Sequence, residues 1–547
     1  MNRALVFEAA ATVIMLTVAL AMPRRGTTWL RAAERLLARG ARRRGLAVGL
    51  VVLLAFGGSA AVALLGRLPV PEINDEFSYL LAGDTFAHGR LTNPSHPLWE
   101  HFESMHVLQQ PTYASKYPPG QGLALAAGQV LTGHPVVGVW LSLALFSAAL
   151  TWMLQAWLPP AWALLGGLLV LVRPGVFSYW AQSYWGGAVA ATGGALLFGA
   201  LRRLRSELRS RDALWLGLGL ALLANTRPFE GLLVSLPAAA VLLVELGRLP
   251  SPDRRRALWR VALPLLGVLA LTAAAMGVYN WRVTGDPLRL PYQLYEEQYS
   301  SAPTFLWQRP RPMPAYRHQA LRDFNEIMAR KYLKEHSFRG WLGEKAGRAR
   351  YLWRIYLGPA LTVPLLMLPW VLRDRWMRLA LLTSGALGAG LLVETWTHPH
   401  YAAPITGLLF ALVLQGMRHL CIWRWRGRPT GRCMVWAIVL LCVVLAPEQV
   451  RREPHAWSLD RARILARLEG DGNRNLVVVR YWPGHHPYDE WVYNAADVDG
   501  AKVVWAREMD ADQNRKLLEY FKGRRAWLLE ADAEPPRLTA YPVGSGP

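Results

Sequence analysis

The chain has 547 residues, of which 53% are hydrophobic and 18% charged, with 25 tryptophans and a net charge of +23. No basic stripe with interleaved aromatic residues occurs in a polar region, so the positive charge does not indicate nucleic-acid binding. The three cysteines have no metal-ligand spacing and predict neither a disulfide framework nor a zinc site.

Apolar blocks of about 15–22 residues, separated by short Arg-rich stretches, are typical of a polytopic membrane protein. The first block lacks a strongly basic flank and a small-residue cleavage site, so we expect a retained span rather than a signal peptide. About twelve membrane-spanning helices are predicted, at Ala4–Ala21, Leu46–Gly66, Pro135–Trp157, Ala161–Phe177, Gly187–Leu201, Ala213–Ala224, Phe229–Leu246, Trp259–Tyr279, Trp353–Leu372, Leu379–Val393, Ala402–Met417 and Met434–Leu445.

The Arg-rich loops between these blocks set the predicted orientation. With the spans above, all of them fall on one side of the membrane, which the positive-inside rule assigns to the cytoplasm. They are Arg24–Arg44, Arg202–Arg211, Arg248–Arg260, Arg373–Arg378 and Arg418–Arg432. Counting the short apolar stretch Gly120–Leu131 as a span would break this agreement, so we expect an interfacial or re-entrant helix there.

The first large outer loop, residues 67–134, carries an acidic pair, Asp75-Glu76, shortly after the span Leu46–Gly66. This position holds two carboxylates at the depth of lipid phosphates, where a catalytic base for a lipid-linked donor would be needed. The alternative is that they are ordinary acids at the start of the helix that follows.

A second cluster lies further along the same loop. Glu103 and His106 would share a helical face, with His101 nearby, and could hold a divalent metal, but their spacing fits no specific metal motif. A polar helix that faces an acceptor is the default interpretation. Lys116, before Tyr117, is placed to meet a lipid phosphate as a point charge. Snorkelling of Lys116 to the headgroups is the alternative.

Three further sets occur where apolar blocks meet on the predicted outer side. Arg227 suits a phosphate by bidentate hydrogen bonding, or forms a structural pair with Glu230. Aromatic and amide groups at Gln182, Tyr184 and Trp185 favour sugar binding, or belong to an interfacial aromatic belt. A His-Pro-His bend offers a phosphate contact, a proton shuttle or simple interfacial satisfaction, at His398, His400 and Tyr401.

The domain organisation follows from the change in composition near residue 447. Residues 1–447 are predicted to form the membrane domain, with a second large outer loop at 280–352. In the polar tail, 448–547, short apolar runs at Leu476–Val479, Lys502–Trp505 and Ala526–Leu529 and a helical stretch at Ala511–Phe521 predict a small α/β domain outside the membrane. The expected fold is an all-α polytopic membrane protein with interfacial helices and this domain at its C-terminus.

The pattern resembles the GT-C class of integral-membrane glycosyltransferases, and more narrowly the bacterial protein-mannosyltransferase and aminoarabinose-transferase-like subgroup. Asp75-Glu76, Tyr117–Pro119 and His398–Tyr401 carry the likeness, together with the many-span body. The resemblance implies a polyprenyl-phosphate sugar donor, with Asp75 as catalytic base and Glu76 beside it.

We therefore expect an inverting transfer of a sugar to an acceptor hydroxyl or amine at the outer face of a bacterial inner membrane. Lys116, Arg227, His398 and His400 would contact the donor phosphate, and Tyr117, Gln182, Tyr184, Trp185 and Tyr401 the sugar or acceptor. No cofactor is expected, because a phosphate is already a good leaving group; a divalent metal is the weaker alternative. A transporter or flippase of lipid-linked sugars, or a glycan ligase or polymerase, are the alternative functions.

Overall fold

The computed structural model describes residues 3–21, 27–449 and 454–542, and most of them are helical. The apolar blocks form a bundle of helices, because a backbone in hydrocarbon must satisfy its N–H and C=O groups internally. The bundle consists of α1 (Arg3–Ala21), α3 (Arg44–Leu65), α6 (Val136–Trp157), α7 (Pro160–Val170), α8 (Ala188–Leu204), α9 (Ser210–Ala224), α10 (Pro228–Gly247), α12 (Leu263–Thr284), α18 (Arg375–Val393), α19 (Thr406–Cys421) and α20 (Thr430–Leu445).

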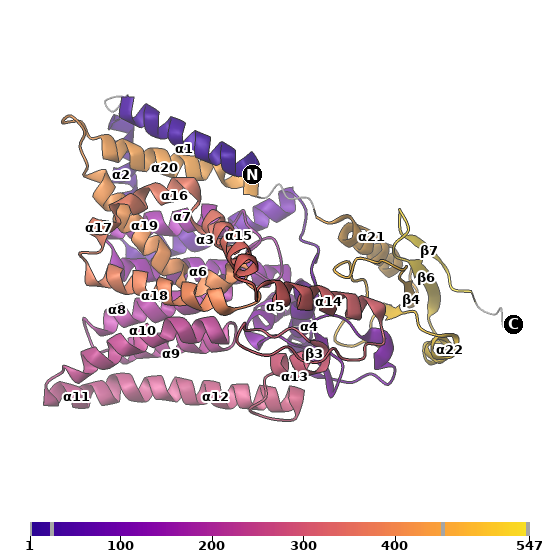
Figure 1. The fold of residues 1–547 in the computed structure, drawn as a ribbon. Coiled ribbons are helices and arrows are strands. Elements are labelled where there is room, and N and C mark those ends of the chain that lie inside the picture. Colours follow the sequence, from indigo (N-terminus) through magenta and orange to yellow (C-terminus); the bar gives the residue numbers. More distant parts are fainter. Residues whose placement is uncertain (1–2, 22–26, 450–453, 543–547) are drawn as a thin grey trace.

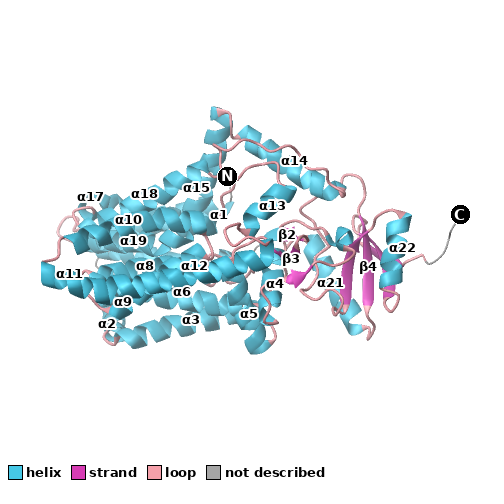
Figure 2. Cartoon of the chain, turned by 90° about the horizontal axis from the view of Figure 1, so that it is seen from below, coloured by secondary structure: helices cyan, strands magenta, loops and turns pink. Residues whose placement is uncertain are grey.

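The two ends of the bundle differ. The short helices α2 (Thr27–Ala41), α11 (Ser251–Ala257) and α17 (Leu368–Val371), which lie in or beside the Arg-rich loops, gather at one end (Figures 1 and 2). The opposite end carries the elements of the predicted outer loops, namely α4 (Asn74–Ala87), α5 (Pro119–Thr132), α13 (Pro291–Tyr299) and α14 (Gln319–Lys334). The Arg-rich segments and the predicted outer loops thus lie at opposite ends of the bundle.

All twelve predicted spans are helical over most of their length, but they differ in length and character. Within the described residues, seven helices are long and apolar enough to cross a membrane, or eight if one bent pair is a single span. Two more are shorter apolar helices, Leu5–Ala21 and Pro160–Gly175, and the remaining two are α8 and α9. The number of twelve therefore stays a prediction.

The predicted span Trp353–Leu372 is not one continuous helix. It is divided between α15 (Phe338–Tyr356) and a second helical segment, Gly358–Val371, and the two are bent by 88°. Gly358 sits at the bend with φ +59°, a conformation that side chains with a Cβ rarely adopt. A Cβ there would also lie 2.6 Å from the Glu8 carboxylate and 2.8 Å from the Arg173 guanidinium, so glycine is favoured at this position.

The first outer loop folds against the bundle. It contains a small antiparallel sheet of order β1-β3-β2, built from β1 (Asn93–Pro94), β2 (Val107–Leu108) and β3 (Thr112–Ser115). The predicted interfacial helix at Gly120–Leu131 is α5, which packs on α4 so closely that a Cβ at Gly122 would lie 2.7 Å from that of Ala82. Helix α5 is not among the helices long enough to span.

The C-terminal region forms a four-stranded sheet of order β5-β4-β6-β7, parallel except for the last pair. The three predicted strands and the predicted helix are present. The strands could be predicted because buried parallel strands appear in a sequence as continuous apolar runs. The sequence analysis missed α21 and the short edge strand β7. The elements are α21 (Ala456–Gly470), β4 (Asn475–Arg480), β5 (Val503–Arg507), α22 (Ala511–Tyr520), β6 (Arg525–Glu530) and β7 (Arg537–Ala540).

This C-terminal domain is not an independent appendage. Phe77 and Leu81 of α4 belong to one buried hydrophobic cluster with Leu476 and Val478 of β4. The Phe77 ring stacks on Tyr493 at a centroid distance of 4.2 Å. The sheet therefore lies against the same helix that carries the acidic pair (Figure 1).

Candidate active site

A cavity of about 610 Å³ opens where the outer loops meet the bundle. Its walls come from the start of α4, the first outer loop, the α9–α10 junction, α12, α13, α14 and the segment 394–401. Parts of the chain more than 300 residues apart thus face one space. Most of the candidate residues from the sequence lie on its wall.

Asp75 faces this cavity from the first turn of α4, where the helix dipole favours a negative charge. The Tyr117 hydroxyl donates a hydrogen bond to Asp75 Oδ1 (2.5 Å), and His106 Nδ1 lies 3.6 Å from Oδ2. Burial raises the pKa of Asp75, but the His106, Tyr117, His398 and Lys116 side chains more than compensate and leave this pKa below its usual value. Asp75 is therefore ionised at neutral pH.

His106 has a left-handed backbone conformation, φ 65°, which is costly for a residue with a Cβ. Three hydrogen bonds hold it there: its N–H donates to the Tyr295 hydroxyl oxygen, and its carbonyl accepts from Lys116 N and Ser78 Oγ. Burial, with Lys116 nearby, lowers the pKa of His106 to about 3, so the ring is neutral. Because the Tyr117 proton points at Asp75, His106 Nδ1 donates to the Tyr117 oxygen over 3.0 Å.

Glu76, the second acid of the predicted catalytic pair, points away from the cavity. It is 2% exposed and accepts hydrogen bonds from the backbone N–H groups of Glu72 and Tyr184, each 2.8 Å. Burial raises its pKa to about 7. Glu76 ties α4 to the loop 178–186, so the structure gives it a positioning role and separates the two acids.

Lys116 lies on the cavity wall inside a group of tyrosine rings. Its ammonium is 4.6 Å from the ring centre of Tyr295, 4.8 Å from Tyr292 and 5.3 Å from Tyr117. Burial lowers the pKa of Lys116, while the charges of Glu296 and Asp75 act in the opposite direction. Because the Lys116 ammonium is already buried, it can contact a phosphate oxygen without first being transferred out of bulk water.

Arg227, the N-cap residue of α10, also lines the cavity. Its guanidinium lies 3.9 Å from the ring centre of Tyr401, and its Nη1 is 3.8 Å from Glu230 Oε1. Arg227 is thus paired with Glu230 and also faces the cavity. Tyr401 lines the same wall and orients the guanidinium.

The two histidine rings of the predicted His-Pro-His bend do not point at one ligand, because only one of them lines the cavity. His398 lines the cavity, whereas His400 lies behind it with Nδ1 3.2 Å from the Tyr179 hydroxyl. The rings are parallel with centroids 5.7 Å apart, and Trp185 contacts both at 5.0 and 4.8 Å. Of the predicted pair, His398 is therefore the one placed to meet a ligand.

Two of the predicted sugar-binding residues do not line the cavity. Gln182 donates to the carbonyls of Ser59 and Val176, both at 3.3 Å. Tyr184 is buried and its hydroxyl donates to the Pro69 carbonyl. Their polar groups hold the loop together, so only Trp185 of that loop reaches the cavity.

The three residues of the metal alternative do not converge. The chain is helical only at Trp99–Phe102 here, so Glu103 and His106 share no helical face. His101 Nδ1 lies 2.8 Å from the Arg507 carbonyl, and Glu103 accepts from the Tyr299 hydroxyl. Among the described residues no group of three His, Cys, Asp or Glu side chains is arranged to hold a metal ion.

Sequence reasoning missed two sets of cavity residues. Tyr292 and Tyr295 on α13 surround Lys116, and their spacing of three in a helix was a readable signal. Tyr488 comes from the C-terminal domain, and no local pattern places it beside Asp75. Glu394, by contrast, was singled out in the sequence together with the His-Pro-His bend, and it is buried at the end of α18 and lines the cavity wall.

The fold was compared with solved structures. ArnT from Cupriavidus metallidurans bound to undecaprenyl phosphate is 13% identical, with a TM-score of 0.50 over 88% of this chain and 92% of that one. Its apo state is 14% identical, with a TM-score of 0.48 over 86% and 91%. The Archaeoglobus fulgidus oligosaccharyltransferase tethered with an acceptor peptide is 9% identical, with a TM-score of 0.45 over 90% and 70%.

ArnT is an aminoarabinose transferase, and both neighbours are GT-C glycosyltransferases. No family model matches this sequence, and no curated protein sequence matches it. The similarity to ArnT bound to undecaprenyl phosphate is therefore one of fold. In that respect the resemblance to the GT-C class predicted from the sequence is confirmed.

Proposed function

We propose that this chain is a membrane glycosyltransferase that moves a sugar from a polyprenyl-phosphate donor to an acceptor hydroxyl or amine. The observation that carries the proposal is that one cavity brings the ionised Asp75 together with Lys116 and Arg227. A carboxylate and two cations are what a base and a phosphate site require. The fold shared with ArnT, in a structure that contains undecaprenyl phosphate, supports a polyprenyl-linked donor.

In the proposed step, an acceptor oxygen attacks the anomeric carbon while its proton passes to Asp75. The bond between the anomeric carbon and the phosphate oxygen breaks, and its electron pair leaves with the polyprenyl phosphate. Attack opposite the leaving group inverts the anomeric carbon. Lys116 and Arg227 stabilise the charge that grows on the phosphate, and the neutral ring of His398 can donate a further hydrogen bond.

We place this site on the periplasmic side of a bacterial inner membrane. The cavity lies at the end of the bundle that carries α4 and α13, and the Arg-rich loops lie at the opposite end (Figure 2). Under the positive-inside rule the basic end is cytoplasmic. The C-terminal domain then lies on the periplasmic side with the cavity.

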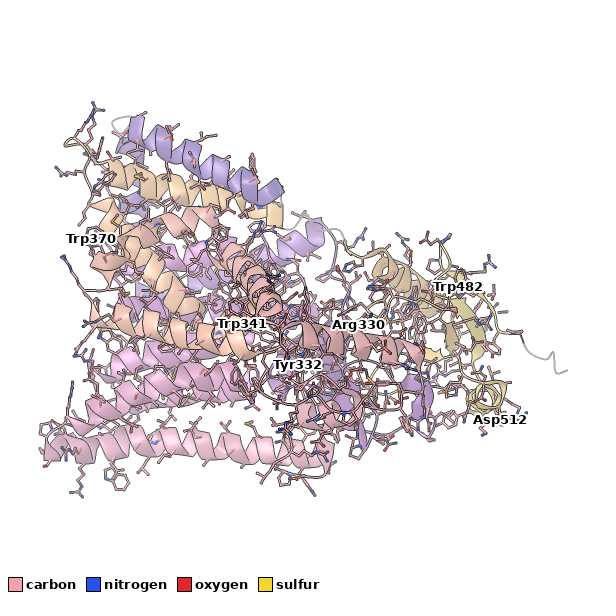
Figure 3. The ribbon with its side chains drawn as sticks, viewed as in Figure 1. Arg330, Tyr332, Trp341, Trp370, Trp482 and Asp512 are labelled. Carbon is pink, nitrogen blue, oxygen red and sulfur yellow. The ribbon has the colours of Figure 1, made fainter. Side chains whose placement is uncertain are left out.

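The test is transfer of a labelled sugar from synthetic polyprenyl-phosphate donors by the purified protein in lipid nanodiscs. Asp75→Asn should lower transfer by about 100-fold or more, the scale of a lost general base. Asp512→Asn is the matched control, because this exposed acid on α22 lies at the far end of the C-terminal domain (Figure 3).

Substantial transfer by Asp75→Asn would exclude Asp75 as the base. If every donor stays intact while lipid-linked sugar crosses a vesicle bilayer, the transporter alternative replaces the enzyme. If the wild-type protein does not bind undecaprenyl phosphate at all, both the transferase and the transporter of lipid-linked sugars are excluded.

A further inference from the structure

The wall of the cavity includes one residue of the C-terminal domain, Tyr488. It lies in an irregular segment between β4 and β5, residues 481–502, and 36% of it is exposed. Tyr488 and Asp75 belong to different domains but line the same cavity. The contacts made by the neighbours of Tyr488 hold it there.

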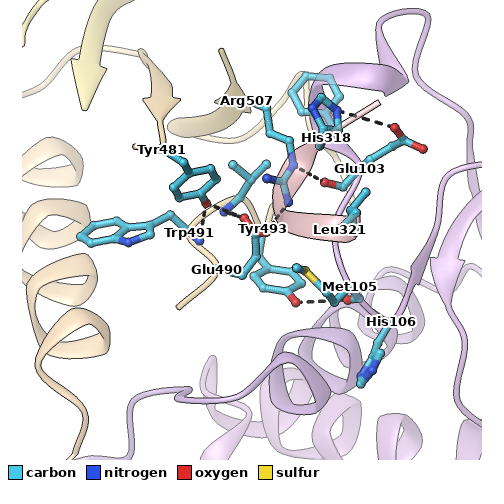
Figure 4. Close-up of polar contacts among 12 residues, drawn as sticks. Glu103, Met105, His106, His318, Leu321, Tyr481, Glu490, Trp491, Tyr493 and Arg507 are labelled. Carbon is cyan, nitrogen blue, oxygen red and sulfur yellow. Dashed lines mark hydrogen bonds and ion pairs between the residues drawn. The ribbon is translucent and has the colours of Figure 1, made fainter. Parts of the chain in front are cut away.

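The segment that carries Tyr488 is pinned by a buried ion pair two residues further on. Glu490 is fully buried, pairs with Arg507, and accepts hydrogen bonds from the Tyr481 hydroxyl (2.6 Å) and Val492 N (2.8 Å). Arg507 in turn donates from Nε to the Glu103 carbonyl at 2.7 Å, which lies in the first outer loop (Figure 4). The pair thus links the C-terminal domain to that loop.

A second link lies beside the first. The Tyr493 hydroxyl donates to the Met105 carbonyl at 3.1 Å, directly before His106 (Figure 4). Arg461 of α21 donates to the carbonyls of Trp491 and Tyr493, at 3.0 and 2.9 Å. These bonds attach the irregular segment 481–502 to the rest of the C-terminal domain. Breaking so many buried polar contacts is costly, so the position of Tyr488 relative to the first loop is fixed.

A row of rings connects Tyr488 with the candidate base. The Phe324 ring of α14 lies 5.5 Å from Tyr488 and 5.6 Å from His106. His106 Nδ1 is in turn 3.6 Å from Asp75. Asn325, next to Phe324, lines the same part of the cavity wall; its Nδ2 donates to the Leu321 carbonyl, which leaves the amide oxygen for a ligand.

We propose that Tyr488, Phe324 and Asn325 form the acceptor subsite, and that its ligand is a carbohydrate whose hydroxyl is directed at Asp75. Two aromatic rings set at an angle of 69° offer faces for a pyranose, and the Tyr488 phenol and the Asn325 amide oxygen offer hydrogen bonds to its hydroxyl groups. This inference rests on the proposed function, since it assigns the acceptor side of the same cavity. The C-terminal domain becomes a part of the active site that selects the acceptor.

The experiment is hydrogen–deuterium exchange on the full-length protein in nanodiscs, with maltooligosaccharides, a Ser/Thr-rich peptide and undecaprenyl phosphate as separate probes. The oligosaccharide should slow exchange at least threefold in residues 320–328 and 485–493. Tyr488→Ala and Phe324→Ala should each remove this protection. Trp482→Ala is the matched control, because Trp482 is an aromatic residue of the same segment, 46% exposed and outside the cavity lining (Figure 3).

Binding of undecaprenyl phosphate, measured by native mass spectrometry, should stay within about twofold of wild type in the Tyr488 and Phe324 variants. Protection by the peptide alone, equal protection in Tyr488→Ala, or no protection of these residues by the oligosaccharide would each overturn the proposal. Failure of the wild type to bind undecaprenyl phosphate would instead contradict the donor assignment, while the exchange data still test the subsite.

Discussion

The Tyr117 hydroxyl donates a hydrogen bond to the carboxylate of Asp75 across a sequence separation of 42 residues. The same oxygen accepts a hydrogen bond from His106, whose backbone is held in the left-handed region. His106 therefore orients the Tyr117 hydroxyl, and that hydroxyl in turn orients the Asp75 carboxylate. This relationship makes the protonation of Asp75 depend on the fold of the first outer loop.

Tyr117→Phe removes one hydrogen bond that favours the ionised form of Asp75. The pKa of Asp75 is held below its usual value in part by this bond, so it should rise in the variant. Activity is lost as pH falls through that pKa, and the acidic limb of the pH–rate profile should therefore move to higher pH by about one unit, or about 1.4 kcal/mol. An unshifted acidic limb with a uniformly lower rate would mean that Tyr117 acts on the substrate instead.

Glu76 should make the stability of the protein fall as pH rises. Burial raises its pKa to about 7 from an ordinary value near 4.5, so the stabilisation from the neutral form is complete below the unfolded pKa and is lost as pH rises through about 7. The full effect is on the order of 3 kcal/mol. Thermal unfolding of wild type and Glu76→Gln between about pH 4 and 8 should show the steeper decline in the wild type, and parallel curves would disprove the assignment.

Two variants of Arg227 should separate its ligand contact from its structural pairing. Arg227→Lys keeps a positive charge near Glu230 but loses the planar fork, so affinity for undecaprenyl phosphate should fall about tenfold with little change in melting temperature. Arg227→Met leaves the buried Glu230 unpaired and should cost about 3–5 kcal/mol of stability. Equal affinity in Arg227→Lys and wild type would remove Arg227 from the phosphate site.

Metal removal should leave the transfer rate unchanged. We propose that no metal takes part, because Lys116 and Arg227 supply the positive charge that the departing phosphate needs. Dialysis against EDTA, followed by assay with and without added Mg²⁺, Mn²⁺ or Zn²⁺, measures this directly. A rate that falls with EDTA and returns with one of these ions would require a metal in the mechanism.

The buried pair Arg507–Glu490 should show strong coupling. Glu490→Gln alone leaves a buried guanidinium without its charge partner and should destabilise the C-terminal domain by about 3 kcal/mol or more. Adding Arg507→Met should restore part of this loss, because it removes the unpaired charge. Amide exchange in β4 and β5 provides the readout for this double-mutant cycle, and additive effects of the two changes would indicate independent roles.

Much of the architecture could be predicted because its signals are local. Apolar blocks, Arg-rich loops and the three buried runs of the C-terminal sheet depend on residues close together in the sequence. The bend at Gly358 was not predictable in the same way, because a positive φ and the approach of the Arg173 guanidinium depend on distant parts of the chain. For that reason the sequence predicts a span there but not its bend.

The sequence by itself indicated three charged groups that line the cavity, because Asp75 and Lys116 stand out in the loop 67–134 and Arg227 lies at a junction of two apolar blocks, where a charge is costly. Only the tertiary structure decided which neighbours face the cavity. Successive residues in a helix point about 100° apart, so Asp75 enters the cavity and Glu76 turns to the backbone of Tyr184. It also decided that Tyr488 lies there, because buried contacts between remote segments, rather than any local pattern, fix its position.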